Sequence, residues 1–148
     1  MHQLLRQRPP INSDNAFFFK ALEEDKLVAQ QCSNCGLFRH PPVPCCPKCQ
    51  SFEWQATEIQ GHGQLLSYTV IHHPVVRPFQ KGYIVGLVAL EHGVHMVMNL
   101  EFPENKAEIG MSIEVRPHRY DDELVLMAGF YQGQDFDGVP LSETEREH

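Results

Sequence analysis

All five cysteines of the chain lie close together, in the segment CSNCGLFRHPPVPCCPKC from Cys32 to Cys49. Two Cys-x-x-Cys pairs, Cys32 with Cys35 and Cys46 with Cys49, are separated by ten residues. This spacing is typical of two tight turns that surround one metal ion with four thiolates. Zinc is the expected metal, and iron fits the same ligands. Because four protein ligands fill a tetrahedral coordination sphere, we expect a structural centre that performs no catalysis.

Other uses of the cysteines explain the pattern less well. One redox-active pair would leave the second pair without a role, and disulfides are rare in reducing compartments. Cys45 is an additional thiol, and using it in place of Cys46 would break the two-residue spacing. We therefore predict Cys32, Cys35, Cys46 and Cys49 as the ligand set, and the function must be sought in the rest of the chain.

The composition indicates a globular protein that stays off membranes. Of the 148 residues, 42% are hydrophobic and 21% are charged, which suits one compact domain with an appended module. No apolar run approaches the roughly 20 residues that span a bilayer, and the N-terminus lacks the apolar core of a signal peptide. We therefore expect a cytoplasmic protein. Twelve Lys and Arg against nineteen Asp and Glu disfavour nucleic acid as the main partner, because that binding depends on cationic contacts with phosphates.

A helix is predicted over NAFFFKALEEDK, residues 15–26, with Ser13 or Asp14 as its cap. It carries three consecutive phenylalanines, and one helix face cannot bury all three. At least one of them must meet a second surface, a partner or a ligand. We take Phe17 and Phe18 as candidate contacts. A short strand, KLVAQQ, leads into the first cysteine pair.

Alternating apolar residues predict β-strands in the second half of the chain. The segments are EWQATEI as a first strand, then QLLSYTVIHH, YIVGLVALE, VHMVMNLE, GMSIEVRPH and LVLMAGF. About five short strands with glycine bends and no βαβ unit favour a small closed barrel of the OB type. The chain thus reads as a mainly β protein with four regions: a helical segment with a lead-in strand (1–31), a ribbon around the metal (32–52), the barrel (53–132) and a flexible acidic tail (133–148).

Motifs for independent catalysis are missing from the sequence. Ser67 lies within a predicted strand and has no Gly-x-Ser-x-Gly turn around it. No Gly-x-Gly-x-x-Gly or phosphate-loop pattern occurs. We therefore expect no catalytic residues, and a chain that is not an enzyme by itself.

The ordered series of motifs resembles a family of bacterial and archaeal proteins that join a rubredoxin-like zinc ribbon to an OB-fold, long catalogued as a domain of unknown function. The shared segments are AFFFKALEEDKLVAQQC, the cysteine segment, GHGQLLSYTVIHHP, YIVGLVALEHGVHMVMNL and IGMSIEVRP, which together cover roughly residues 14 to 131. Two departures are modest. Gln50 stands where the family often has glycine, and Cys45 is additional.

The resemblance implies an accessory role in acyl-CoA metabolism. Members are similar to small subunits that partner thiolases or hot-dog-fold enoyl-CoA hydratases in lipid, sterol or polyketide-like pathways. In those assemblies the OB domain packs against the enzyme and helps to form an acyl-CoA-binding surface. The resemblance therefore implies an acyl-CoA ligand, a partner enzyme, and a homo- or hetero-oligomer. Two readings stay open beside it: an OB module that binds single-stranded nucleic acid, and an electron carrier if the metal is iron.

One predicted loop is suited to contact acyl-CoA. It follows the strand that ends at His72 and His73, and its cations suit phosphate groups while its aromatic side chains suit adenine or an acyl chain. An ordinary barrel loop remains the alternative. Besides Phe17 and Phe18, the candidate ligand or partner contacts are Tyr68, His72, His73, Arg77, Phe79, Lys81 and Tyr83.

Overall fold

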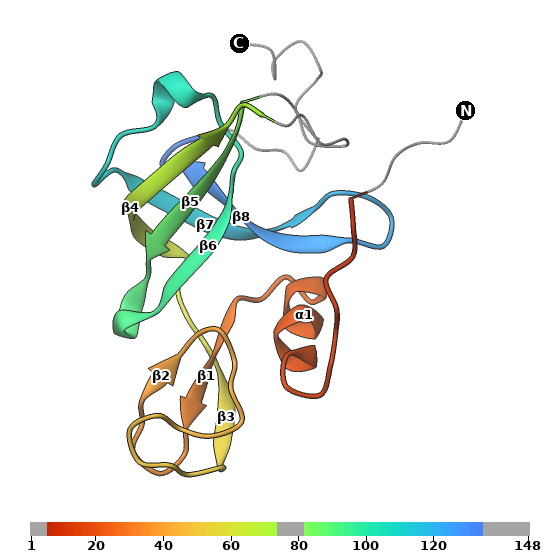
Figure 1. The fold of residues 1–148 in the computed structure, drawn as a ribbon, viewed down its shortest axis with the longest axis vertical. Coiled ribbons are helices and arrows are strands. Elements are labelled where there is room, and N and C mark those ends of the chain that lie inside the picture. The colour runs from red at the N-terminus through yellow and green to blue at the C-terminus, as the bar shows by residue number, and fades with distance from the viewer. Residues whose placement is uncertain (1–5, 74–81, 135–148) are drawn as a thin grey trace.

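A computed structural model describes residues 6–73 and 82–134, which form one helix, a small sheet and a barrel (Figure 1). The helix α1 spans Ala16–Glu23. The small sheet contains β1 (Val28–Cys32), β2 (Phe38–Arg39) and β3 (Trp54–Glu58). The barrel contains β4 (His62–Ile71), β5 (Tyr83–Ala89), β6 (His95–Leu100), β7 (Ser112–Arg119) and β8 (Val125–Tyr131), with the short 3-10 turns η1 (Glu91–Gly93) and η2 (Glu104–Lys106) between strands. No helix in the described ranges is long and apolar enough to cross a bilayer.

The barrel is closed and has five strands, as the sequence predicts. Its strand order is β4-β5-β6-β8-β7. All neighbours are antiparallel except β6 and β8, which pair in parallel at Asn99–Ala128 and Leu100–Gly129. Inward residues alternate along β5 and β6, and the buried face of β6 carries Met96, Met98 and Leu100. The period of two therefore places one apolar face inside the barrel.

Two glycines make room for Leu100 in the barrel core. A Cβ atom added to Gly86 or to Gly129 would lie 2.7 Å from a methyl carbon of the Leu100 side chain. Real side chains do not approach that closely, so both positions require glycine for close packing. Leu100 thus packs against the backbone of strands on both sides of β6.

The first strand predicted for the barrel belongs to the small sheet instead. All of β3 pairs antiparallel with β1, from Val28 opposite Glu58 to Cys32 opposite Trp54. The alternation of EWQATEI identifies a strand but does not identify its neighbour, because pairing is decided by contacts distant in sequence. The small sheet, in the order β2-β1-β3, therefore carries the metal-binding turns and is called the ribbon sheet.

Helix α1 lies between the ribbon sheet and the β7–β8 hairpin (Figure 1) and contacts both β1 and β8. Its cap is Asn15, so the predicted caps Ser13 and Asp14 are wrong. The Asn12 carboxamide oxygen accepts hydrogen bonds from the backbone N–H groups of Asp14 and Asn15, at 2.9 and 3.1 Å. That local turn holds the chain out of helical geometry until Asn15, which delays the start of the helix.

Candidate metal centre

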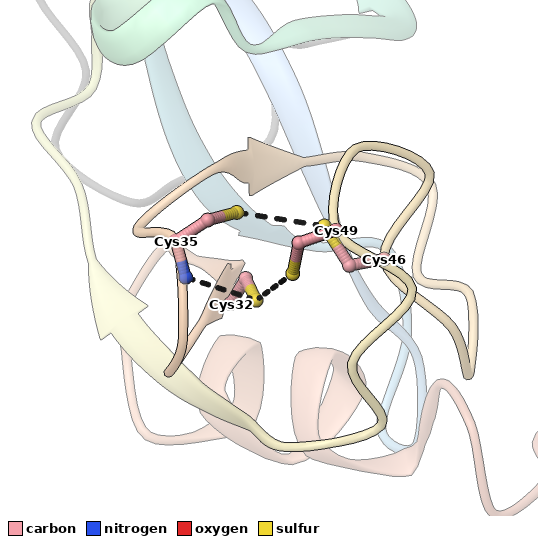
Figure 2. Close-up of side chains that lie close together, drawn as sticks. All are labelled: Cys32, Cys35, Cys46 and Cys49. Atoms are coloured by element: carbon pink, nitrogen blue, oxygen red, sulfur yellow. Dashed lines mark hydrogen bonds between the residues drawn. The ribbon is translucent and has the colours of Figure 1, made fainter.

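Four cysteine sulfur atoms gather in one cluster at the end of the ribbon sheet (Figure 2). All four Sγ atoms lie within 4.8 Å of one another. The Sγ atoms of Cys32 and Cys49 are 3.5 Å apart, and those of Cys35 and Cys46 are 3.7 Å apart. Zinc–sulfur bonds of about 2.3 Å in a regular tetrahedron give sulfur–sulfur distances of about 3.8 Å. The four thiols therefore fit one tetrahedral metal ion.

The two turns that carry the cysteines have the same backbone hydrogen bonds. In the first, the Gly36 N–H donates to the carbonyl oxygen of Cys32 at 3.0 Å; in the second, the Gln50 N–H donates to that of Cys46 at 2.9 Å. The residue after each pair is left-handed, with φ of +79° at Gly36 and +66° at Gln50. Gln50, like Gly36, therefore occupies a position where glycine is the least strained residue.

Backbone N–H groups lower the pKa of two of the four thiols, those of Cys32 and Cys46. The Cys35 N–H lies 3.5 Å from the Cys32 sulfur and is the largest cause of a pKa lowered to about 6 at Cys32. The Cys49 N–H lowers the pKa of Cys46 in the corresponding way. At Cys35 the N–H of Leu37 also lowers the pKa, but burial and the neighbouring thiols outweigh it and raise the pKa to about 11. Crowded thiols cannot all be thiolates without a cation among them, and a divalent metal would supply that charge.

Cys45 lies outside the cluster. Its Sγ contacts the backbone carbonyl oxygen of Cys46 at 3.8 Å, and its side chain is half-buried. The four cysteines predicted as ligands are the four that come together, whereas the additional thiol points elsewhere. A metal bound here would hold both turns and the end of β1 together, which is the role of a structural centre.

The three phenylalanines of α1 pack against other side chains of this chain. The ring of Phe17 lies 4.6 Å from the ring of Trp54 on β3, centroid to centroid. Phe18 is only 4% exposed. Phe19 packs edge-on against Phe18, with ring centroids 5.4 Å apart. The helix thus packs against both the ribbon sheet and the barrel core, and Phe18 also lines an apolar cavity with His40 and Met98.

Of the remaining predicted ligand contacts that the structure describes, His72, His73 and Tyr83 lie where β4 ends and β5 begins, and Tyr68 lies within β4. Tyr68 and Tyr83 are half-buried, and His72 and His73 are exposed. Tyr83 pairs with Ile71 in the β4–β5 register. Arg77, Phe79 and Lys81 lie outside the described residues. Because this end of β4 is at the top of the view in Figure 1 and α1 lies below the barrel, the described residues of this group lie apart from Phe17 and Phe18.

Comparisons with known proteins place both halves of the fold in one family. Residues 19–55 match the family described as "ChsH2, rubredoxin-like zinc ribbon domain", and residues 56–118 match "ChsH2, C-terminal OB-fold domain". A solved structure described as "Ltp2-ChsH2(DUF35) aldolase" contains a chain with 45% sequence identity and a TM-score of 0.80; the match covers 84% of the present chain and 98% of that one.

Two curated relatives are named as subunits of hydratases. The "Probable enoyl-CoA hydratase alpha subunit" of Thermomonospora curvata is 47% identical over 82% of this chain. The "3-oxo-4,17-pregnadiene-20-carboxyl-CoA hydratase alpha subunit" of Mycobacterium tuberculosis is 32% identical over 72% of it. The chain spans only 39% and 34% of the lengths of these two relatives. With both of its domains matched in order by ChsH2 family models, and with a relative 47% identical over 82% of its length, the chain belongs to the ChsH2 family of zinc-ribbon and OB-fold proteins.

Proposed function

We propose that this protein is a non-catalytic accessory subunit of an enzyme of acyl-CoA metabolism, with a thiolase or an enoyl-CoA hydratase as its partner. One observation carries the proposal: the chain matches 98% of a chain in a structure described as "Ltp2-ChsH2(DUF35) aldolase", in which a ChsH2 protein is named together with an enzyme. The relatives named as hydratase alpha subunits support the same role, since each is one subunit of a larger enzyme. The chemistry would then take place in the partner.

The surroundings of the described side chains support a binding role. The four thiols would occupy every position of a tetrahedral ion, which leaves none for an activated water. His92 is stacked on Phe38, with ring centroids 4.2 Å apart and planes within 7°. His118 is buried and packs against the rings of Tyr120 and Phe130. His118 therefore serves as a packing group, whereas His92 stays exposed on its other side, with Nε2 3.8 Å from a Glu91 carboxylate oxygen.

Zinc is the metal we propose for the centre, in a purely structural role. Zinc has no redox chemistry and accepts four thiolates in tetrahedral geometry, which suits a clasp. Iron in the same ligand set would give a coloured, redox-active protein. Elemental analysis of the purified chain distinguishes the two: we expect about one zinc per chain and a colourless preparation, whereas stoichiometric iron would make electron transfer the leading function.

Complex formation with the enzyme tests the proposal directly. The purified chain would be mixed with Ltp2, the protein named in the similar aldolase structure, and run on a sizing column with light scattering. We expect both proteins to elute in one complex. The same experiment with the partner subunit of the Thermomonospora curvata hydratase tests a hydratase as the partner. If the chain elutes separately from both enzymes, and both are fully active without it, the accessory role is refuted.

A further inference from the structure

Arg39, on β2, is a buried cation whose guanidinium is only partly hydrogen-bonded. The residue is 7% exposed. Its Nε donates to the carboxamide oxygen of Gln30 at 2.8 Å, and its Nη2 donates to the carbonyl oxygen of Val43 at 3.2 Å. Its Nη1 is buried and has no hydrogen-bond partner among the residues that the structure describes. Both acceptors are neutral, so they satisfy N–H groups but leave the positive charge, which arginine keeps at any ordinary pH, without a counter-charge.

No carboxylate balances this charge within the described part of the chain. The ion pairs found there involve Arg8, His92 and Arg116, and none involves Arg39. Taking a charge out of water is costly unless an opposite charge lies close to it. Because Arg39 is almost fully covered, an anion from solution has little access to it. We therefore expect the compensating negative charge to lie inside the protein.

The metal centre lies on the same face of the ribbon sheet as the Arg39 side chain. Arg39 is directly opposite Gln30 in the β1–β2 register, and Cys32 follows Gln30 by two residues on β1. Opposite residues of an antiparallel pair share a face of the sheet, and so do residues two apart on one strand. The hydrogen bond between Arg39 and Gln30 agrees with this placement.

A loaded metal centre is itself an anion. Four thiolates around a divalent ion leave a net charge of minus two. Two of the ligands, Cys32 and Cys46, are 2% and 0% exposed, so water screens little of this charge on their side of the cluster. The backbone N–H groups that point at the sulfur atoms are dipoles and carry no net charge. A buried guanidinium on the same face therefore supplies what they cannot, a full positive charge.

We propose that Arg39 is the internal counter-charge of the metal centre, and that its guanidinium strengthens the binding of a divalent ion by the four thiols. The inference goes beyond the proposed accessory role and rests on the metal proposed for the centre. Gln30 acts as a positioning residue, because its carboxamide oxygen holds Arg39 Nε on this face. A trivalent ion would leave the centre with a charge of minus one. The same guanidinium therefore favours divalent over trivalent ions.

Two substitutions in the full-length chain change the charge beside the centre. Arg39→Gln removes the cation. Gln30→Glu neutralises it instead, and a carboxylate oxygen can still accept both hydrogen bonds, from Arg39 and from the Val43 N–H. Zinc affinity is measured by competition with a chromogenic chelator. We expect at least about tenfold weaker zinc binding in both variants, because attraction between buried charges is poorly screened. If Arg39→Gln does not fold, Gln30→Glu decides the question.

The reduction potential of the iron-loaded chain gives a second readout, which a purely structural role of Arg39 would not move. One-electron reduction of the ferric centre by dithionite changes its net charge from minus one to minus two, and a nearby cation stabilises the more negative form. We therefore expect both variants to have lower potentials than the wild type. Arg39→Lys, which keeps the charge, should retain more of the zinc affinity and of the potential than Arg39→Gln does.

Lys48→Gln is the matched control, because Lys48 lies between Cys46 and Cys49 but is exposed, where water screens its charge. Its effect on zinc affinity and on potential should be much smaller. Equal effects of Lys48→Gln and Arg39→Gln would overturn the proposal, and so would wild-type zinc affinity and potential in Gln30→Glu. Arg39 would then only hold the loop at Val43. Failure of the wild type to bind any metal would refute the metal centre itself, while complex formation with the enzyme tests the accessory role separately.

Discussion

Gln50 offers a sharp test of how the metal-binding turns are built. It follows Cys49 with φ of +66°, a left-handed conformation that Gly36 adopts in the equivalent place after Cys35. A side chain in that region is strained because Cβ crowds the carbonyl oxygen. We therefore expect Gln50→Gly to stabilise the protein, and Gly36→Gln to destabilise it.

The magnitude follows from two opposing effects. A residue other than glycine in the left-handed region costs about 1–2 kcal/mol. Glycine in turn gives the unfolded chain more conformational freedom, which removes about 0.4–1 kcal/mol of stability. The net gain for Gln50→Gly is therefore about 0.5–1 kcal/mol, equivalent to about 1–4 °C in melting temperature for a chain of this size. For Gly36→Gln the loss should be similar, because the nearest atom to an added Cβ is 4.0 Å away and steric overlap adds nothing.

Thermal unfolding of the metal-loaded proteins, followed by circular dichroism, measures both effects. Gln60→Gly is the control: Gln60 is an exposed loop residue whose φ is not positive, so only the entropic loss should remain and stability should fall slightly. Metal content must be equal in all variants. If Gln50→Gly melts at or below the wild-type temperature while Gln60→Gly behaves as expected, strain at the second turn does not exist in solution and the equivalence of the two turns is wrong.

Three further perturbations have defined outcomes. Chelation, or Cys32→Ser, should lower the melting temperature and release the metal to a chromogenic chelator, while Cys45→Ser should change neither, because its sulfur lies outside the cluster. Gly129→Ala should lower the free energy of unfolding in urea by about 1–3 kcal/mol, since the new methyl group overlaps the barrel core. The hydrogen bond from Arg8 lowers the pKa of the Asp121 carboxyl in the folded protein. The ionised carboxylate therefore stabilises the fold at any pH above the pKa that Asp121 has in the unfolded chain. This stabilisation is lost as the pH falls through the pKa of Asp121 in the folded protein. The difference in melting temperature between the wild type and Asp121→Asn should therefore be present at pH 7 and disappear under acid conditions; a constant difference would contradict the assignment.

The local parts of the architecture were predictable from the sequence. The metal cluster depends on two short turns of fixed spacing, and such turns are determined by residues next to one another. The barrel strands were predictable because the side chains of β6 alternate between a buried and an exposed face. The closed five-stranded arrangement followed from their number and from the lack of helical connections between them.

Features made by distant segments were not predictable in the same way. The strand β3 has the alternation of a barrel strand, yet it pairs with β1, about 26 residues earlier in the chain. The second surface that Phe17 meets is Trp54, which no local pattern connects to the helix. His40 carries no motif at all, and it lines a cavity only because the ribbon loop packs beside α1 and the barrel. A search for histidines next to apolar loop residues would have included it, but among nine histidines it had nothing to distinguish it.

Strand β1 connects the metal centre with the cavity. Cys32 and Gln30 lie two residues apart on β1 and therefore on the same face of the ribbon sheet. Cys32 belongs to the metal cluster, and Gln30 holds the loop that carries His40 to the cavity. The same loop connects the two cysteine pairs, so a bound metal fixes it at both ends. A metal in the ribbon would thus help to fix the wall of this cavity, which links the ribbon to the barrel through one loop.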